Sequence, residues 1–192
     1  MSTFTFKEVS VDLWPDLERL FGENGACGGC WCQVWRIPRG GKLWDETKGA
    51  KAKKMMKALF KSGDITGLLA YDGEKPAGWC SYGPRTVFPR VETAKAYRRD
   101  DVAGVWSINC FFIDKNYRRI GLSKLMLAAA LKFLRKRKVK IVEGYPVPLT
   151  KDGKQLPPAF TYQGPLKIFE EAGFEIVQRL SYSRPLVRKT LR

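Results

Sequence analysis

The feature that most constrains this chain is an apolar run, a basic turn and an amphipathic segment between residues 108 and 130. Residues 108–113 are apolar and short, as in a buried strand. One buried helix face is predicted by apolar residues at three- and four-residue steps: Leu122, Leu125, Met126, Ala129 and Phe133. Strands interleaved with helices of this kind favour a mixed α/β sheet with helices on both faces.

The turn between this strand and helix has the composition of an anion site. Gly121 and Ser123 are small, so the first N–H groups of the helix can face outward. These unpaired donors and the helix dipole attract negative charge. Arg118 and Arg119 add positive charge that suits a pyrophosphate, although two solvated arginines in a turn would look the same in the sequence.

At these residues the chain resembles the GNAT N-acetyltransferase superfamily. Its acetyl-CoA signature is Arg/Gln-x-x-Gly-x-Gly/Ala, and Arg118, Gly121 and Ser123 stand at the three marked positions. Ser123 replaces the usual Gly or Ala, which is a change between small residues. A second match is residues 165–174, which resemble the last GNAT helix and its Ala-Gly-Phe exit. The resemblance covers residues 64–190 well and the N-terminal third loosely.

The resemblance implies an α/β (α+β) fold with a mixed, mostly antiparallel sheet flanked by helices. The motif strand and the strand at residues 139–145 would splay apart in a V. We expect one domain over residues 1–192. Residues 1–63 would supply the N-terminal strand, helices and acceptor-side loop, and residues 64–192 the acetyl-CoA-binding core. Two further expectations are a helix at residues 46–61 and a short helix at residues 91–98.

The resemblance also implies acetyl-CoA as co-substrate. The backbone of residues 111–113 would pair with pantetheine, and the N–H groups of residues 119–124 would hold the pyrophosphate. The candidate cofactor-binding residues are therefore Phe111, Phe112, Ile113, Arg118, Arg119, Ile120, Gly121, Leu122, Ser123 and Lys124.

The implied reaction transfers an acetyl group to an amine of a small molecule or peptide, which requires removal of one proton and protonation of the departing thiolate. The chain differs from better-defined members of the superfamily at positions where they carry catalytic residues. Phe169 stands where a tyrosine often acts as the acid, and Ser107 stands where some members carry a basic glutamate. The chain has no histidine, which excludes the commonest general base.

Five residues remain as catalytic candidates. Glu143, on the strand across the expected cleft, could be a base with a raised pKa or a structural carboxylate paired with a cation. Tyr145 and Tyr162 could be acids or wall residues. Ser107 and the next side chain on its face, Asn109, could orient a water.

Cys27, Cys30 and Cys32 form a second unusual segment. They could hold zinc with Cys80 or Cys110, or form a redox pair. No histidine or second Cys-x-x-Cys completes the usual zinc ligand spacing, so we expect no metal and a loop that walls the acceptor pocket. The segment also resembles one in bacterial GNAT-like proteins of uncharacterised function.

Composition limits the alternatives. Five cysteines, no signal peptide and no apolar run of about 20 residues predict a cytoplasmic protein that does not enter membranes. The net charge of +16 suits an anionic cofactor, an acidic substrate or nucleic acid, but dispersed basic residues disfavour nucleic acid. A non-catalytic acyl-CoA-sensing or nucleic-acid-docking module and a zinc- or redox-dependent regulator remain alternatives. The aromatic loops allow an aromatic or hydrophobic amine, the resemblance is compatible with a homodimer, and the acceptor stays open.

Overall fold

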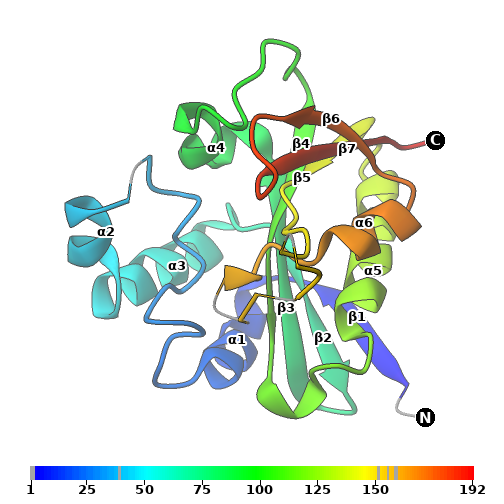
Figure 1. Cartoon of the computed structure of the whole chain (residues 1–192). Coiled ribbons are helices and arrows are strands. Elements are labelled where there is room, and N and C mark those ends of the chain that lie inside the picture. The colour runs from blue at the N-terminus through cyan, green and yellow to red at the C-terminus, as the bar shows by residue number, and fades with distance from the viewer. Residues whose placement is uncertain (1–2, 39, 151, 155, 158–159) are drawn as a thin grey trace.

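The protein is described by a computed structural model over residues 3–38, 40–150, 152–154, 156–157 and 160–192. The strands are β1 (Phe4–Glu8), β2 (Gly67–Asp72), β3 (Lys75–Pro84), β4 (Val105–Ile113), β5 (Ile141–Gly144), β6 (Glu175–Arg179) and β7 (Pro185–Thr190). The helices are α1 (Trp14–Phe21), α2 (Lys42–Thr47), α3 (Ala50–Ser62), α4 (Pro89–Thr93), α5 (Leu122–Lys136) and α6 (Leu166–Glu171). Figure 1 shows their arrangement.

The strands form one seven-stranded sheet in the order β1-β2-β3-β4-β5-β7-β6. Every neighbouring pair is antiparallel except β4 and β5, which run parallel. Pairing between β4 and β5 covers only Val105–Ile108 against Ile141–Gly144, and β4 then continues to Ile113 paired with β3 but not with β5. The predicted mixed, mostly antiparallel sheet with two diverging central strands is therefore confirmed.

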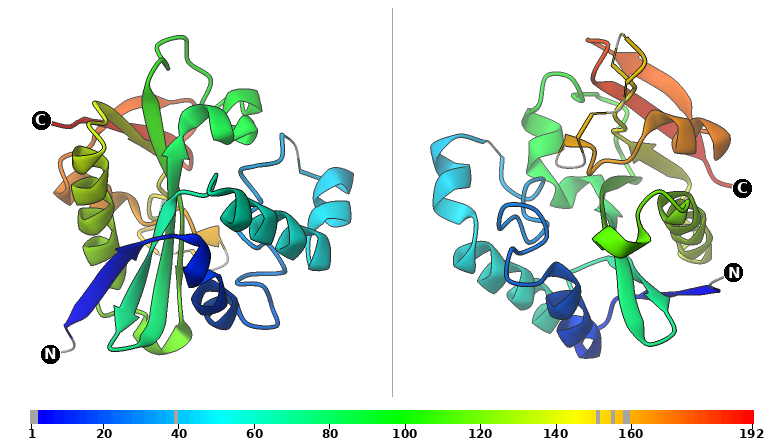
Figure 2. Two further views of the ribbon diagram at one scale, coloured as in Figure 1. Left: turned by 180° about the vertical axis from the view of Figure 1, so that it is seen from behind. Right: turned by 60° about the horizontal axis from the view of Figure 1, so that its bottom comes forward.

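Helices cover both faces of the sheet, as the two views in Figure 2 show. On one face α5 and α6 pack over a core that includes Leu68, Ile108 and Met126. On the other face α1 and α3 enclose an aromatic core around Trp31 and Trp79. No helix in the described part of the chain is both long and apolar enough to cross a membrane.

One β-bulge interrupts the alternation of β4. Ser81 of β3 pairs with Cys110, and the next residue, Tyr82, pairs with Ile108. Asn109 is therefore the extra residue on β4. Bulges of this kind bend a strand, and this one lies where β4 leaves β5.

Three helix predictions need correction. The helix expected at residues 46–61 is two helices, because the chain breaks at Gly49, whose φ is +79° and whose N–H donates to the Gly29 carbonyl oxygen at 2.8 Å. The short helix expected at residues 91–98 is α4, which ends at Thr93. The buried face of α5 is also rotated from the expected one, so that Leu125 is exposed and Leu127, Leu131 and Leu134 are buried instead.

Candidate functional site

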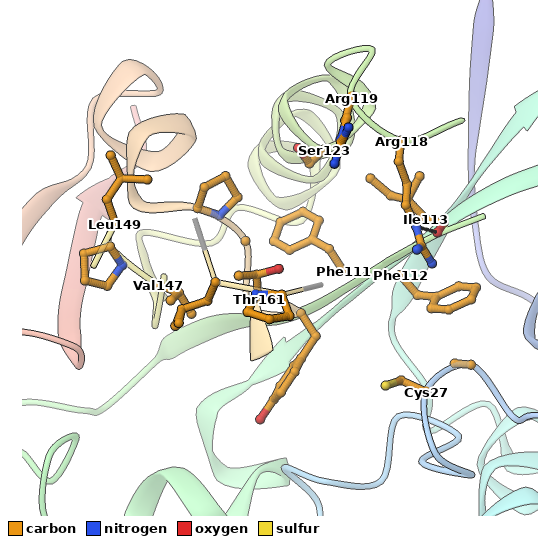
Figure 3. Close-up of a pocket in the computed structure, with 17 residues that line it drawn as sticks. Cys27, Phe111, Phe112, Ile113, Arg118, Arg119, Ser123, Val147, Leu149 and Thr161 are labelled. Atoms are coloured by element: carbon orange, nitrogen blue, oxygen red, sulfur yellow. Dashed lines mark hydrogen bonds between the residues drawn. The ribbon is translucent and has the colours of Figure 1, made fainter. Parts of the chain in front are cut away.

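A large cavity lies where β4 runs on beyond β5. Its volume is about 780 Å³. Phe111, Phe112 and Ile113 of β4 form one wall, and residues 147–149, which follow β5, form another. Figure 3 shows Arg118, Arg119 and Ser123 gathered at one end of this cavity, with Val147 and Leu149 across from them. The cavity is thus formed by the divergence of the two strands.

The arginine end of the cavity is fixed by an unusual turn. Arg119 and Gly121 have φ values of +64° and +83°, and Gly121 is the N-cap of α5. Arg118 donates from Nε to the carbonyl oxygen of Ile113 at 3.0 Å, so its guanidinium lies over the end of β4. Two cations and the N-terminus of a 15-residue helix therefore face the same space. This end of the cavity fits a phosphate group.

The predicted cofactor residues divide into two sets. Six line the large cavity: Phe111, Phe112, Ile113, Arg118, Arg119 and Ser123. The side chains of the rest lie elsewhere: Ile120 is exposed, Leu122 is buried in the core and Lys124 Nζ lies 2.7 Å from Glu171 Oε2. Gly121 can contribute only its backbone.

A smaller cavity of about 360 Å³ adjoins the large one. The two share part of their lining: Ala26, Cys27, Phe111, Phe112 and Tyr162. Aromatic side chains, including Trp35, Trp44 and Phe160, and three cysteines make up most of the smaller cavity's remaining wall. Among the described residues that line it, Arg90 is the only charged one, and no sequence pattern indicated its position.

Tyr162 lies at the junction of the two cavities. Its carbonyl oxygen accepts a hydrogen bond from the Phe111 N–H at 2.5 Å, where the resemblance places pantetheine. Burial raises the pKa of the Tyr162 hydroxyl to about 12. The phenol is therefore protonated at neutral pH and can donate a proton at this junction.

Glu143 lies in a buried ionic network. Its side chain is fully buried; Oε2 binds Arg85, and Oε1 accepts from Arg188 Nε at 2.7 Å. The Tyr145 hydroxyl donates to Oε2 at 3.0 Å. No sequence pattern indicated Arg85 as a partner of Glu143; its side chain is only 1% exposed although it lies in a basic, irregular segment.

Tyr145 and Ser107 belong to this same network. The two hydroxyls are 2.7 Å apart. Burial, with the nearby Glu143 charge, raises the pKa of Tyr145 well above its usual range. Glu143, Tyr145 and Ser107 thus come together, but none of them lines either cavity.

Asn109, the bulge residue, is also fully buried. Neither its Oδ1 nor its Nδ2 has a hydrogen-bond partner among the described residues. An unsatisfied buried amide is costly and marks a position for a bound water or ligand group.

The cysteines of the N-terminal loop reach the smaller cavity. Cys27, Cys30 and Cys32 line it together with Cys110, and all are free thiols. In the described part of the chain, no group of three or more cysteine and acidic side chains is arranged to hold a metal ion.

More than half of the sequence matches the model of a known protein family. The model described as the acetyltransferase (GNAT) family matches residues 34–144, which is more than half of the chain. The chain belongs to the GNAT acetyltransferase family. GNAT members use acetyl-CoA, and the matched region contains β4 and the arginine turn of the large cavity. No curated protein matches the sequence.

Solved GNAT structures share the fold at low identity. An N-acetyltransferase from Thermoplasma acidophilum in complex with coenzyme A has 11% identity and a TM-score of 0.56 over 98% of this chain and 99% of that chain. A GNAT acetyltransferase from Streptococcus pneumoniae has 14% identity and a TM-score of 0.56 over 99% and 100%. A ribosomal-protein-S5-alanine acetyltransferase from Vibrio fischeri has 11% identity and a TM-score of 0.53 over 97% and 92%.

Proposed function

We propose that this GNAT protein is an N-acetyltransferase that moves an acetyl group from acetyl-CoA to an amine held in the smaller cavity. The observation that carries the proposal is the shared wall of the two cavities at Phe111, Phe112 and Tyr162. A donor with its phosphates at Arg118 and Arg119 would extend along β4 toward that wall. An acceptor in the smaller cavity would meet it there.

The lining of the smaller cavity supports an acceptor class. Aromatic walls favour an apolar or aromatic body. Arg90 supplies a cation in a cavity whose described lining has no carboxylate, so an acidic group on the acceptor would be stabilised there. We therefore propose an amine that carries both an apolar or aromatic body and an acidic group.

Proton transfer would use few protein groups. Tyr162 is protonated and lies at the junction, so it would protonate the departing thiolate. The described lining of the smaller cavity has no carboxylate, so a water would take the amine proton; Asn109 lines neither cavity and would not hold that water directly. Both oxygens of Glu143 are engaged by guanidinium groups away from the cavities, which favours a structural role for it over the role of base.

Binding and turnover test the proposal separately. Acetyl-CoA at about 100 times its dissociation constant should stabilise the protein by about 2.7 kcal/mol. Ser123→Glu should remove this stabilisation by adding negative charge and bulk at the phosphate end. Ser181→Glu, at an exposed turn, is the matched control and should retain it. If both variants respond alike, the phosphate assignment is wrong.

Turnover is measured as release of free CoA with L-phenylalanine and with phenethylamine, which lacks the carboxylate. Phenylalanine should be the better acceptor. Arg90→Gln should raise the KM for phenylalanine by about tenfold to a hundredfold. The exposed Arg98→Gln should not change it. If acetyl-CoA binds but no amine gives CoA release above hydrolysis, the non-catalytic sensing module is the better account.

A further inference from the structure

Two thiols from distant parts of the sequence meet at the wall of the smaller cavity. Cys32 comes from the loop after α1, and Cys110 comes from β4 beside the bulge. Both are nearly completely buried, with 5% and 7% of the residue exposed, and both line the cavity. Both side chains belong to the same buried cluster on the α1 and α3 face of the sheet, and the two thiols interact with each other there.

The backbone that presents Cys32 is strained. Trp31 and Cys32 have φ values of +41° and +54°, a region that side-chain-bearing residues rarely adopt. Burial of the Trp31 ring, stacked on Trp14 at 5.8 Å, holds this turn in place. Strain of this kind persists only where the surrounding structure imposes it, and it is often found at functional sites. Here the turn directs Cys32 inward, toward the sheet.

Polar side chains that have no hydrogen-bond partner of their own lie near Cys32. Trp79 and Ser81 of β3 are fully buried, and neither Trp79 Nε1 nor Ser81 Oγ has a hydrogen-bond partner among the described residues. Nε and Nη2 of Arg36 are likewise unpartnered. Donors and a cation placed in this way stabilise a thiolate.

The protonation of the two thiols follows from this environment. Hydrogen bonding from Cys110 lowers the pKa of Cys32, and interactions with Trp79 and Ser81 lower it further. The Arg36 charge acts in the same direction. The same contact with Cys32, together with burial, raises the pKa of Cys110. Cys32 is therefore the more readily ionised thiol of the pair.

We propose that Cys32 and Cys110 are a reactive thiol pair that hydrogen peroxide converts to a disulfide. The Cys32 thiolate attacks one peroxide oxygen, the O–O bond breaks, and the released hydroxide takes a proton to become water. Cys32 is then a sulfenic acid. The Cys110 sulfur attacks the Cys32 sulfur, the S–O bond breaks, and the hydroxide leaves as water with the Cys110 proton. Two thiols are oxidised and one peroxide is reduced to two waters.

The chain contains its own control thiol. Cys80 is fully buried in the core on the α5 side of the sheet and lines neither cavity. Burial raises the pKa of Cys80 well above its usual range. Cys80 should therefore remain reduced when the Cys32–Cys110 pair is oxidised.

The experiment treats the full-length protein with hydrogen peroxide at pH 7 and maps disulfides in unreduced peptides by mass spectrometry. We expect one Cys32–Cys110 disulfide that dithiothreitol reverses, and the same result for Cys80→Ser. Cys110→Ser should stop at the Cys32 sulfenic acid, which dimedone labels. A disulfide that instead joins Cys27 to Cys30, or dimedone labelling confined to the exposed Cys27, would overturn the proposal. Mapping on the wild-type protein decides the matter even if Cys110→Ser fails to fold, and none of these measurements requires acetyltransferase activity.

Discussion

The main-chain N–H of Phe111 donates a hydrogen bond to the carbonyl oxygen of Tyr162 at 2.5 Å. This bond joins the loop before α6 to β4 through the backbone, so the position of Tyr162 does not depend on its hydroxyl group. Pantetheine could pair with the Phe111 N–H only if the hydrogen bond between this N–H and the Tyr162 carbonyl oxygen broke.

Tyr162→Phe should therefore separate chemistry from binding. We expect kcat to fall by about tenfold to a hundredfold, because a general acid contributes at least about a hundredfold and solvent can replace part of it. The KM for acetyl-CoA should be unchanged. Since the Tyr162 pKa is about 12, the wild type should show no loss of this acid between pH 6 and 9. The half-exposed Tyr182→Phe is the control; equal kcat values in the two variants would remove Tyr162 from the mechanism.

Glu143→Gln should lower the free energy of unfolding and should have little effect on proton transfer. It leaves Arg85 and Arg188 without their shared buried carboxylate, and breaking a buried ion pair costs about 3–5 kcal/mol. Glu92→Gln removes the other, partly exposed partner of Arg85 and should cost less than about 1 kcal/mol. Urea denaturation measures both. A stable Glu143→Gln protein whose activity recovers as pH rises from 6 to 9 would instead identify Glu143 as the base.

Gly121→Ala tests the turn before α5. A Cβ there would meet no atom within 4 Å, so any cost comes from the φ of +83°. Left-handed backbone costs a non-glycine residue about 1 kcal/mol, and thermal or chemical denaturation should show a loss of this size. Ser123→Ala keeps ordinary helical geometry and should be neutral. A Gly121→Ala protein as stable as the wild type would contradict the left-handed turn.

The ion pairs of Asp101 predict a dependence of stability on pH. Hydrogen bonds from Arg99 and Arg188 hold the pKa of Asp101 below its usual range. A lowered folded-state pKa contributes stability that is present above the unfolded pKa and is lost as pH falls through the folded one. The destabilisation caused by Asp101→Asn should therefore shrink as pH falls from 5 to 2. Urea denaturation at each pH measures this, and a destabilisation that is the same at pH 5 and pH 2 would contradict the role of these ion pairs.

Ser81→Ala tests the environment of Cys32. Loss of the Ser81 hydroxyl should raise the Cys32 pKa, so the thiolate fraction falls at pH 7 but hardly changes at high pH. The rate of peroxide oxidation should drop severalfold at pH 7 and approach the wild-type rate near pH 9–10. The exposed Ser183→Ala is the control. A rate difference that is the same at every pH would indicate altered access rather than altered ionisation.

The predictions from sequence were most accurate where residues close together in the chain determine the structure by themselves. The glycine-bearing turn and the strand before it specify their own geometry, so Arg118 and Ser123 could be placed at a cavity in advance. The apolar spacing of α5 predicted a helix but not its buried face, because Leu127, Leu131 and Leu134 are apolar too. The break at Gly49 was missed because it depends on a hydrogen bond to Gly29, in another loop. The partners of Glu143 were missed because Arg85 is distant in sequence and buried, whereas composition suggests that arginines in an irregular segment are exposed.

The bulge at Asn109 changes which residues of β4 face the α5 core. Before it, even-numbered residues such as Trp106 and Ile108 face the α5 core; after it, odd-numbered residues such as Phe111 and Ile113 do. Deleting Asn109 would restore regular pleating without turning any of these four side chains to the other face. The extra residue is therefore not needed to orient its neighbours. Its deletion would remove one unsatisfied amide at the point where β4 and β5 diverge.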